Sequence, residues 1–110
     1  ETATCLAFLD INPNSVGHTL CIPKKEVDLI FDLDKDLYQD LMNFSKKIAT
    51  ALKKAVPCER IGMSVIGLEV PHAHVHLIPI NSMKDVSFKN KVKLETKDFE
   101  TLVDQIKSFL

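Results

Sequence analysis

Three histidines that alternate with apolar residues constrain the fold of this chain more than any other feature. They are His72, His74 and His76, in the run HAHVHLIPI over residues 72–80. Because successive side chains of a β-strand point to opposite faces, the run predicts a strand with a row of imidazoles on one face. The other face would belong to the core, and its residues are Ala73, Val75 and Leu77. In a regular strand the two outer histidines would lie about 13 Å apart.

A long amphipathic helix is the clearest of the remaining elements. Apolar residues recur at steps of three and four, which predicts a helix over residues 35–56 with one buried face. Asp34 is suited to cap its first turn, and Pro57 would stop it. A second amphipathic helix is expected after Thr96.

Four short strands are expected around these helices. Their ranges are 4–10, 18–23, 60–67 and 72–80, with loops over 11–17 and 81–90. We expect the third strand to be buried, because it carries almost no charge. Strands that are neighbours in sequence, with one long helix between the two pairs, favour an α+β fold class with a mainly antiparallel sheet.

The composition argues against several classes of protein. Its 14 basic and 15 acidic residues give a formal charge of -1, which does not favour binding to nucleic acid or to an anionic membrane. No apolar run approaches the roughly 20 residues that cross a bilayer, and no signal peptide is visible. The three cysteines follow no metal-binding spacing, which favours reduced thiols and a cytoplasmic location. We expect one domain over residues 1–110, with an N-terminal piece missing, because the chain opens at Glu1 just before a strand.

Three imidazoles in register are a poor choice for stability alone, because they repel one another when charged and lose hydration when buried. A metal site is one alternative, since a His-x-His pair on a strand can bind zinc. All three cannot reach one ion from a regular strand, so a further ligand would come from elsewhere. The candidates for that ligand are His18, Asp10, Glu69 and a cysteine.

The favoured alternative is histidine chemistry without a metal. A neutral imidazole is a competent nucleophile near neutral pH, and a neighbouring imidazole can carry a proton to a leaving group. Attack on a phosphate also needs donors around its non-bridging oxygens, which the same row can supply. His74 has a histidine on each side, which makes it the better candidate for the nucleophile.

At these residues the chain resembles the histidine-triad (HIT) family, whose signature is His-x-His-x-His followed by two apolar residues. Residues 72–78 match that signature in full. A second block, CLAFLDINPNSVGHTLCIPKK over residues 5–25, resembles the family's strand–loop–strand with its Gly-His-x-x-x-x-Pro pattern. The resemblance covers residues 5–80, about two-thirds of the chain.

The resemblance implies a nucleotide hydrolase or transferase, of the phosphoramidase or dinucleoside polyphosphate hydrolase type, which cleaves at the α-phosphate of purine nucleotide conjugates. His74 would be the nucleophile that forms a nucleotidyl-histidine intermediate. His76 would contact the phosphate and help to protonate the leaving group, while His72 and His18 would orient the other two. Asp10, eight residues before His18, would hold the ribose hydroxyls.

Further expectations follow from the same resemblance. The nucleotide base would be flanked by Phe8, Leu9 and Ile11, although these residues suit a core equally well. The family's fold implies a homodimer that pairs through the long helix and a neighbouring strand. The resemblance implies neither a metal nor another cofactor. A histidine at His76 argues against the uridylyltransferase branch, where glutamine takes that place, and favours the Hint-type branch.

The stretch before the triad departs from the family. Residues 67–71 lack the Gly-Gln-Ser/Thr pattern that is common there, and Glu69 stands where many members place a hydroxyl donor near the phosphate. A carboxylate at this place would repel a phosphate unless it points away or pairs with a cation. Because of this departure, the sequence does not predict which leaving group is used. It also allows a second function, a nucleotide-binding module with little catalytic activity.

Overall fold

Four antiparallel strands form one sheet in the order β1-β2-β4-β3. The computed structural model describes residues 1–110. The strands are β1 (Cys5–Leu9), β2 (Thr19–Pro23), β3 (Arg60–Ser64) and β4 (Val75–Ile80). The predicted α+β class with an antiparallel sheet is confirmed, because every neighbouring pair of strands runs antiparallel.

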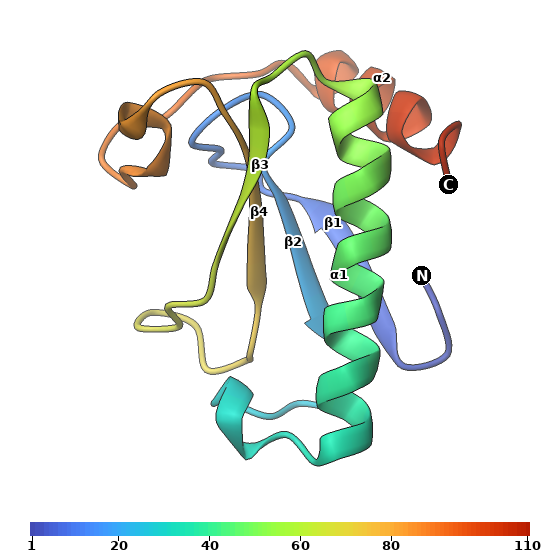
Figure 1. Ribbon diagram of the computed structural model, residues 1–110. Coiled ribbons are helices and arrows are strands. Elements are labelled where there is room, and N and C mark those ends of the chain that lie inside the picture. The colour runs from blue at the N-terminus through green and yellow to red at the C-terminus, as the bar shows by residue number, and fades with distance from the viewer.

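The helix α1 (Lys35–Ala55) packs against one face of the sheet, as Figure 1 shows. Asp34 caps it as predicted, since its carboxylate accepts a hydrogen bond from the backbone N–H of Leu37 at 2.9 Å. The buried face of α1 consists of Leu37, Leu41, Phe44, Ser45, Ile48, Ala51 and Leu52. These side chains meet the inward face of the sheet, where Cys5 and Cys21 are fully buried as free thiols. Burial of this apolar surface is the main stabilising term of the fold.

The predicted C-terminal helix is also present, as α2 (Thr96–Lys107). It buries Leu102 and Ile106 against the core and contacts α1, beside which it lies in Figure 1. Two short 3-10 helices complete the chain, η1 (Ile30–Asp32) before α1 and η2 (Met83–Val86) after β4. No helix is long and apolar enough to span a membrane.

The strand that carries the histidines is shorter than predicted. It begins at Val75 rather than at His72, because the backbone N–H of Ala73 donates to the carbonyl of Val27 instead of pairing within the sheet. A ring nitrogen of His72 lies 2.8 Å from the carbonyl oxygen of Pro23, which holds this residue outside the strand. The spacing of a regular strand therefore does not apply to the first two histidines. The core-facing half of the prediction is confirmed, since Ala73, Val75 and Leu77 are all buried.

The third strand also differs from its prediction. It ends at Ser64 rather than at Gly67, and it is an edge strand rather than a buried one. Only β4 pairs with it, so it has neighbours on one side alone. Apolar residues of this region are accordingly exposed, among them Met63, Val65 and Ile66. A lack of charge did not distinguish an edge from the centre of the sheet.

Candidate active site

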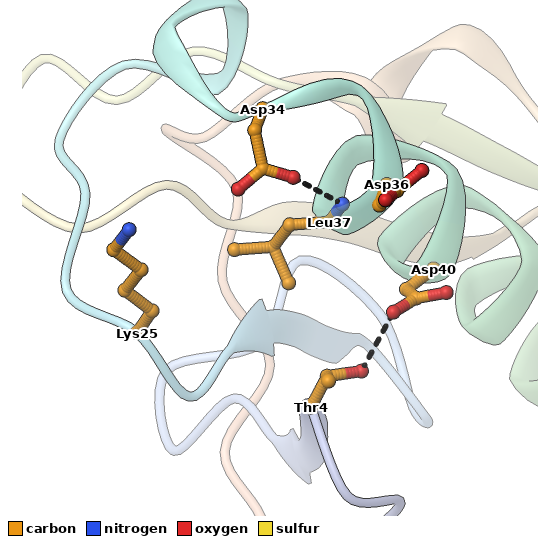
Figure 2. Close-up of a pocket in the computed structure, with 6 residues that line it drawn as sticks. All are labelled: Thr4, Lys25, Asp34, Asp36, Leu37 and Asp40. Carbon is orange, nitrogen blue, oxygen red and sulfur yellow. Dashed lines mark hydrogen bonds between the residues drawn. The ribbon is translucent and has the colours of Figure 1, made fainter.

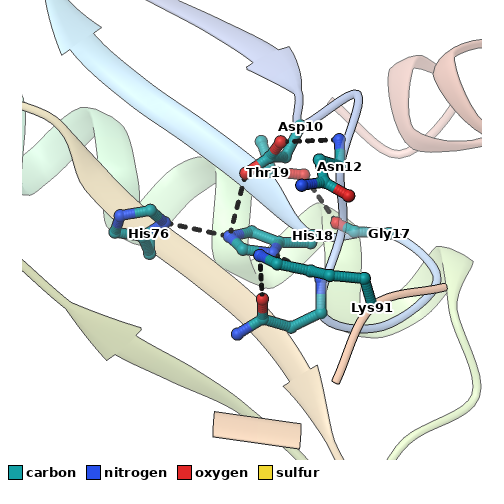
Figure 3. Close-up of polar contacts among 8 residues, drawn as sticks. Asp10, Asn12, Gly17, His18, Thr19, His76 and Lys91 are labelled. Atoms are coloured by element: carbon teal, nitrogen blue, oxygen red, sulfur yellow. Dashed lines mark hydrogen bonds and ion pairs between the residues drawn. The ribbon is translucent and has the colours of Figure 1, made fainter. Parts of the chain in front are cut away.

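The loop between β1 and β2 brings an aspartate and a histidine together at one end of the sheet. The backbone N–H of Asp10 donates to the carbonyl of His18 at 2.9 Å, which closes the loop. Gly17 allows the chain to turn just before His18, because its φ of 95° lies in a region that favours glycine. His18 is buried, and its ring points toward β4, as Figure 3 shows.

His18 and His76 form a direct imidazole–imidazole contact. His18 Nε2 lies 2.9 Å from His76 Nδ1. The backbone N–H of Asn14 donates to His18 Nδ1 at 3.0 Å, so that nitrogen is unprotonated. In a neutral ring the proton is then on His18 Nε2, which donates to His76 Nδ1. The same logic places the proton of a neutral His76 on Nε2, where a ligand oxygen could accept it.

Main-chain carbonyls set the protons of the other two histidines. His74 Nδ1 lies 2.7 Å from the carbonyl oxygen of His72, and His72 Nε2 lies 2.8 Å from the carbonyl oxygen of Pro23. A carbonyl oxygen only accepts, so both ring nitrogens carry hydrogen. Neutral His74 therefore has an unprotonated Nε2, with its lone pair free for nucleophilic attack. The ring of His74 stands 4.8 Å from that of His76, measured between centroids.

Burial keeps the imidazoles of His18 and His76 neutral. It is the largest cause that lowers the pKa of His18 to about 4 and the pKa of His76 to about 4. Asp10 raises both values and Lys91 lowers both, each by less than burial changes them. Both imidazoles are therefore neutral at neutral pH, with one ring proton each, in agreement with the hydrogen bonds assigned above.

Asp10 takes part in a turn and faces the histidines at the same time. One carboxylate oxygen accepts from the backbone N–H of Asn12 at 2.8 Å, while the other lies 3.7 Å from His18 Nε2. Its side chain is partly exposed beside a buried imidazole. The second oxygen thus has room to accept a hydrogen bond from a ligand.

The three apolar residues expected near a base do not lie together. Phe8 pairs with Leu20, which pairs with His76, so Phe8 is on the histidine face of the sheet and is 44% exposed. Ile11 is almost fully exposed in the loop. Leu9 lies on the opposite face and packs against the core, because strand alternation turns it away from Phe8. The structure therefore does not bring Leu9 to the histidines.

Three residues that sequence reasoning missed complete this end of the sheet. The ring of Phe88 stands edge-on to the rings of His76 and His18, with centroids 5.0 Å and 6.1 Å away. Lys91 Nζ lies 4.8 Å from the centre of the Phe88 ring. It also donates a hydrogen bond to Asn14 Oδ1 at 2.7 Å, and Figure 3 shows Lys91 beside His18. Asn14 is buried, and its Nδ2 has no hydrogen-bond partner. Lys91 and Asn14 are 77 residues apart, so no local pattern could have connected them.

The residues placed to hold a metal differ from the expected pair of triad histidines. Asp10, His18 and His76 offer ligand atoms that lie within 4.8 Å of one another, and this set contains one triad histidine rather than two. A metal bound there through His18 Nε2 and His76 Nδ1 would require both nitrogens to lose their shared hydrogen. It would therefore replace the hydrogen bond between the two rings.

A separate cavity near the start of α1 contains none of these residues. Figure 2 shows it between the first turns of α1 and the start of β1, lined by Thr4, Lys25, Asp34, Asp36, Leu37 and Asp40. Asp34 is occupied as the helix cap, and Asp40 accepts a hydrogen bond from the hydroxyl of Thr4. None of the four histidines lines this cavity, so it is separate from the histidine site.

Comparison with known proteins identifies the family of this arrangement. The family model of the HIT domain matches residues 1–83. An uncharacterized HIT-like protein of Borreliella burgdorferi is 38% identical over 115 residues, which cover 96% of this chain and 83% of that protein. The adenosine 5′-monophosphoramidase HNT1 of Saccharomyces cerevisiae is 36% identical over 80 residues, or 72% of this chain and 51% of that enzyme.

The solved structures agree with the sequence comparison. A HIT-like protein of Bartonella henselae, described as involved in cell-cycle regulation, superposes with a TM-score of 0.85 at 28% identity. The superposition covers 100% of this chain and 83% of that one. Because the HIT-domain model matches well over half of the residues, the chain belongs to the HIT family.

Proposed function

We propose that this protein is a metal-independent nucleotide hydrolase or transferase that acts at the α-phosphate of purine nucleotide conjugates. The observation that carries the proposal is the hydrogen bond from His74 Nδ1 to the carbonyl of His72 at 2.7 Å. That bond leaves His74 Nε2 as a free nucleophile without any charged partner. The monophosphoramidase activity in the name of a yeast relative supports the same chemistry.

In the first proposed step, His74 Nε2 attacks the α-phosphorus and forms a P–N bond while the bond to the leaving group breaks. His76 lies beside His74 and directs Nε2 at the phosphate. The negative charge of the bound phosphate raises the pKa of His76, which burial lowers in the free protein. His76 therefore takes up a proton when the substrate binds, and it passes this proton to the leaving group. In the second step, water attacks phosphorus, the P–N bond breaks, and the proton of the water returns to His76.

The remaining residues of the proposed site bind and orient. His72 presents the carbonyl that fixes the tautomer of His74, and His18 fixes that of His76. Asp10 would accept from the ribose hydroxyls through its second carboxylate oxygen. Phe8 offers an exposed ring for the base on the same face of the sheet, with Ile11 at the end of the loop. We propose further that the protein works in the cytoplasm as a homodimer and as one domain over residues 1–110.

The proposal is tested by trapping the intermediate. The protein is mixed with adenosine 5′-phosphoramidate and quenched within one turnover, and mass spectrometry of the digested chain should locate an adenylyl group on His74. His74→Asn keeps a polar atom at the position of Nδ1 but has none at the position of Nε2. It should therefore carry no adduct and lose at least 10³-fold in kcat, about 4 kcal/mol in the barrier. Full turnover by this variant would overturn the mechanism.

A second function has one observation in its favour. Glu69 is exposed and forms no ion pair, so an unneutralised carboxylate lies where many members of the family place a hydroxyl donor. A nucleotide-binding module with little catalysis would fit that feature. Calorimetry that shows micromolar binding of AMP, together with no release of a fluorogenic amine from an adenosine phosphoramidate, would favour this second function.

A further inference from the structure

The peptide group between Pro13 and Asn14 is hydrogen-bonded on both sides. Its N–H donates to His18 Nδ1 at 3.0 Å, which leaves the proton of that ring on Nε2. Its carbonyl oxygen accepts a hydrogen bond from the backbone N–H of Val92 at 2.9 Å. Pro13 and Asn14 are both buried. The peptide group that sets the tautomer of His18 is therefore itself held by a residue far along the chain.

Val92 belongs to a strap, residues 88–92, that lies against this end of the site. The strap follows η2 and lies beyond residue 83, where the match to the family model ends. Lys91 Nζ donates to Asn14 Oδ1 at 2.7 Å, so the strap also contacts the side chain at that peptide group. The ring of Phe88 stands edge-on to the two buried imidazoles of the site. The strap therefore contacts both ends of the hydrogen-bonded series that leads to these rings.

All hydrogen bonds of this series point in the same direction. The N–H of Val92 donates to the peptide group, and the peptide group donates to His18. His18 Nε2 then donates to His76 Nδ1 at 2.9 Å. Hydrogen bonds in such a series polarise one another, because a peptide carbonyl that accepts a bond makes its own N–H a stronger donor. The series ends on His76 Nε2–H, the donor that meets the phosphate in the proposed reaction.

The charges beside His18 oppose each other, so the strap does not act through a net positive charge. A carboxylate oxygen of Asp10 lies 3.7 Å from His18 Nε2. Burial is the largest cause that lowers the pKa of His18, while Asp10 raises this pKa and Lys91 lowers it. Lys91 donates to Asn14 and forms no ion pair with Asp10, which leaves the carboxylate for the ribose. The hydrogen bonds of the strap, and not its charge, lead to the reacting groups.

We propose that the strap is a positioning device for His76. Val92 holds the peptide group that fixes the tautomer of His18, and His18 in turn keeps the proton of His76 on Nε2, toward the phosphate. When the strap is released, Asn14 N–H moves away and the proton of His18 can occupy Nδ1, so that His18 Nε2 no longer donates to His76. Val92 and Lys91 are positioning residues, since neither touches a reacting atom. The inference rests on the proposed function only where turnover is measured.

The main test removes a single backbone donor. Replacing Val92 with its α-hydroxy acid analogue turns the amide into an ester, which deletes the N–H and keeps the side chain. We expect ¹⁵N NMR at pH 7 to show both tautomers of His18, where the unmodified protein shows the Nε2–H form alone. On adenosine 5′-phosphoramidate, kcat should fall about tenfold, while KM changes less than about twofold. The same replacement at Leu94, whose N–H donates to no group of the protein, should change neither the tautomer nor kcat.

The second test concerns the side-chain contact of the strap. Lys91→Met keeps the apolar stem beside Phe88 and removes the donor to Asn14. Because the bond from Val92 remains, this variant should show a smaller fraction of the second His18 tautomer than the ester and a loss of about threefold in kcat. Lys91→Arg, which can donate to the same oxygen, should restore both values. Lys93→Met removes an exposed lysine two residues away and should change neither.

The tautomers separate this inference from the proposed function. A single His18 tautomer in the Val92 ester would overturn the inference, whatever its kcat. A mixture of tautomers with an unchanged kcat would overturn it too, because the reaction would then not require a fixed His76. If the unmodified protein turns over no nucleotide, the proposed function fails, and the NMR spectra of the free protein decide the inference alone. A mixture of tautomers for both His18 and His76 in the ester would then support it.

Discussion

His18 Nε2 lies 2.9 Å from His76 Nδ1, and this single contact joins the β1–β2 loop to the strand that carries the histidine row. The backbone N–H of Asn14 holds the far nitrogen of His18 at 3.0 Å. Asn14 therefore donates a hydrogen bond to His18, and His18 donates one to His76. This leaves the Nε2–H of His76 free to donate to a ligand. The protonation pattern of the site can be checked residue by residue.

The first prediction concerns the tautomers themselves. In ¹⁵N-detected NMR at pH 7, His74 should carry its proton on Nδ1, and His18 and His76 should carry theirs on Nε2. In His18→Gln the donor to His76 is altered, so His76 should show a mixture of tautomers and kcat should fall by about 10- to 100-fold. A wild-type His76 protonated on Nδ1 would contradict the assignment.

A second prediction concerns stability against pH. Burial lowers the pKa of both His18 and His76 to about 4, from an ordinary value of 6.5. Between these two values the unfolded chain binds more protons than the folded one, so the free energy of unfolding decreases as the pH falls from 6.5 toward 4. Urea unfolding at pH 7.0, 5.5 and 4.5 should show this decrease, with a shallower slope in His76→Gln. Equal stability at pH 7.0 and 4.5 would rule out two neutral buried imidazoles.

A third prediction uses the two glycines with positive φ. A Cβ on Gly17 would lie 2.9 Å from Val56 Cγ2, whereas a Cβ on Gly67 would meet nothing within 4 Å. Both substitutions to alanine strain the backbone, at about 1–2 kcal/mol. Gly17→Ala also crowds the core and should cost roughly 1–3 kcal/mol more, measured as the difference in unfolding free energy between the two variants. An equal loss in both would show that the loop can shift away from Val56.

A fourth prediction tests the carboxylate beside the row. If Asp10 accepts from the ribose hydroxyls, Asp10→Asn should lower kcat/KM about tenfold on a ribonucleotide substrate. The same change should have little effect on the 2′,3′-dideoxy analogue, which lacks both donors. The double comparison separates ribose binding from the influence of Asp10 on His18. A similar loss on both substrates would assign Asp10 to positioning His18 alone.

The last prediction concerns metals. Turnover should survive incubation with EDTA, because the proposed steps use imidazoles alone. Added Zn²⁺ should inhibit, since Asp10, His18 and His76 can bind it only when the hydrogen bond between the rings is replaced. Loss of activity on chelation, with recovery on Zn²⁺, would instead make the protein a metalloenzyme.

Sequence reasoning succeeded where a periodic pattern or a matched motif carried the information. The helix α1 followed from the spacing of its apolar residues and from its cap, and both motifs of the family marked segments that meet in space. It failed at His72, where a contact to the distant Pro23 overrides the alternation of a strand. It also failed to distinguish Leu9 from its neighbours, because only the register shows which face a strand residue takes.

The residues that sequence reasoning missed share a physical cause. Phe88 and Lys91 lie in a polar loop without periodicity, and their partners are brought to them only by the folding of the whole chain. Asn14 contacts His18 through its backbone N–H, a group that every residue but proline possesses. Contacts of these two kinds produce no recognisable pattern of residue types along the sequence.

Peptide groups hold one nitrogen in each of His72, His74 and His18, and only His76 depends on another side chain. Replacing the side chains of Pro23 or Asn14 would leave those peptide groups in place. An insertion or deletion of one residue near them would displace all the rings together. The reactivity of the row is thus encoded in the length of two loops rather than in the identity of the residues around it, and it would tolerate substitution far better than a change in length.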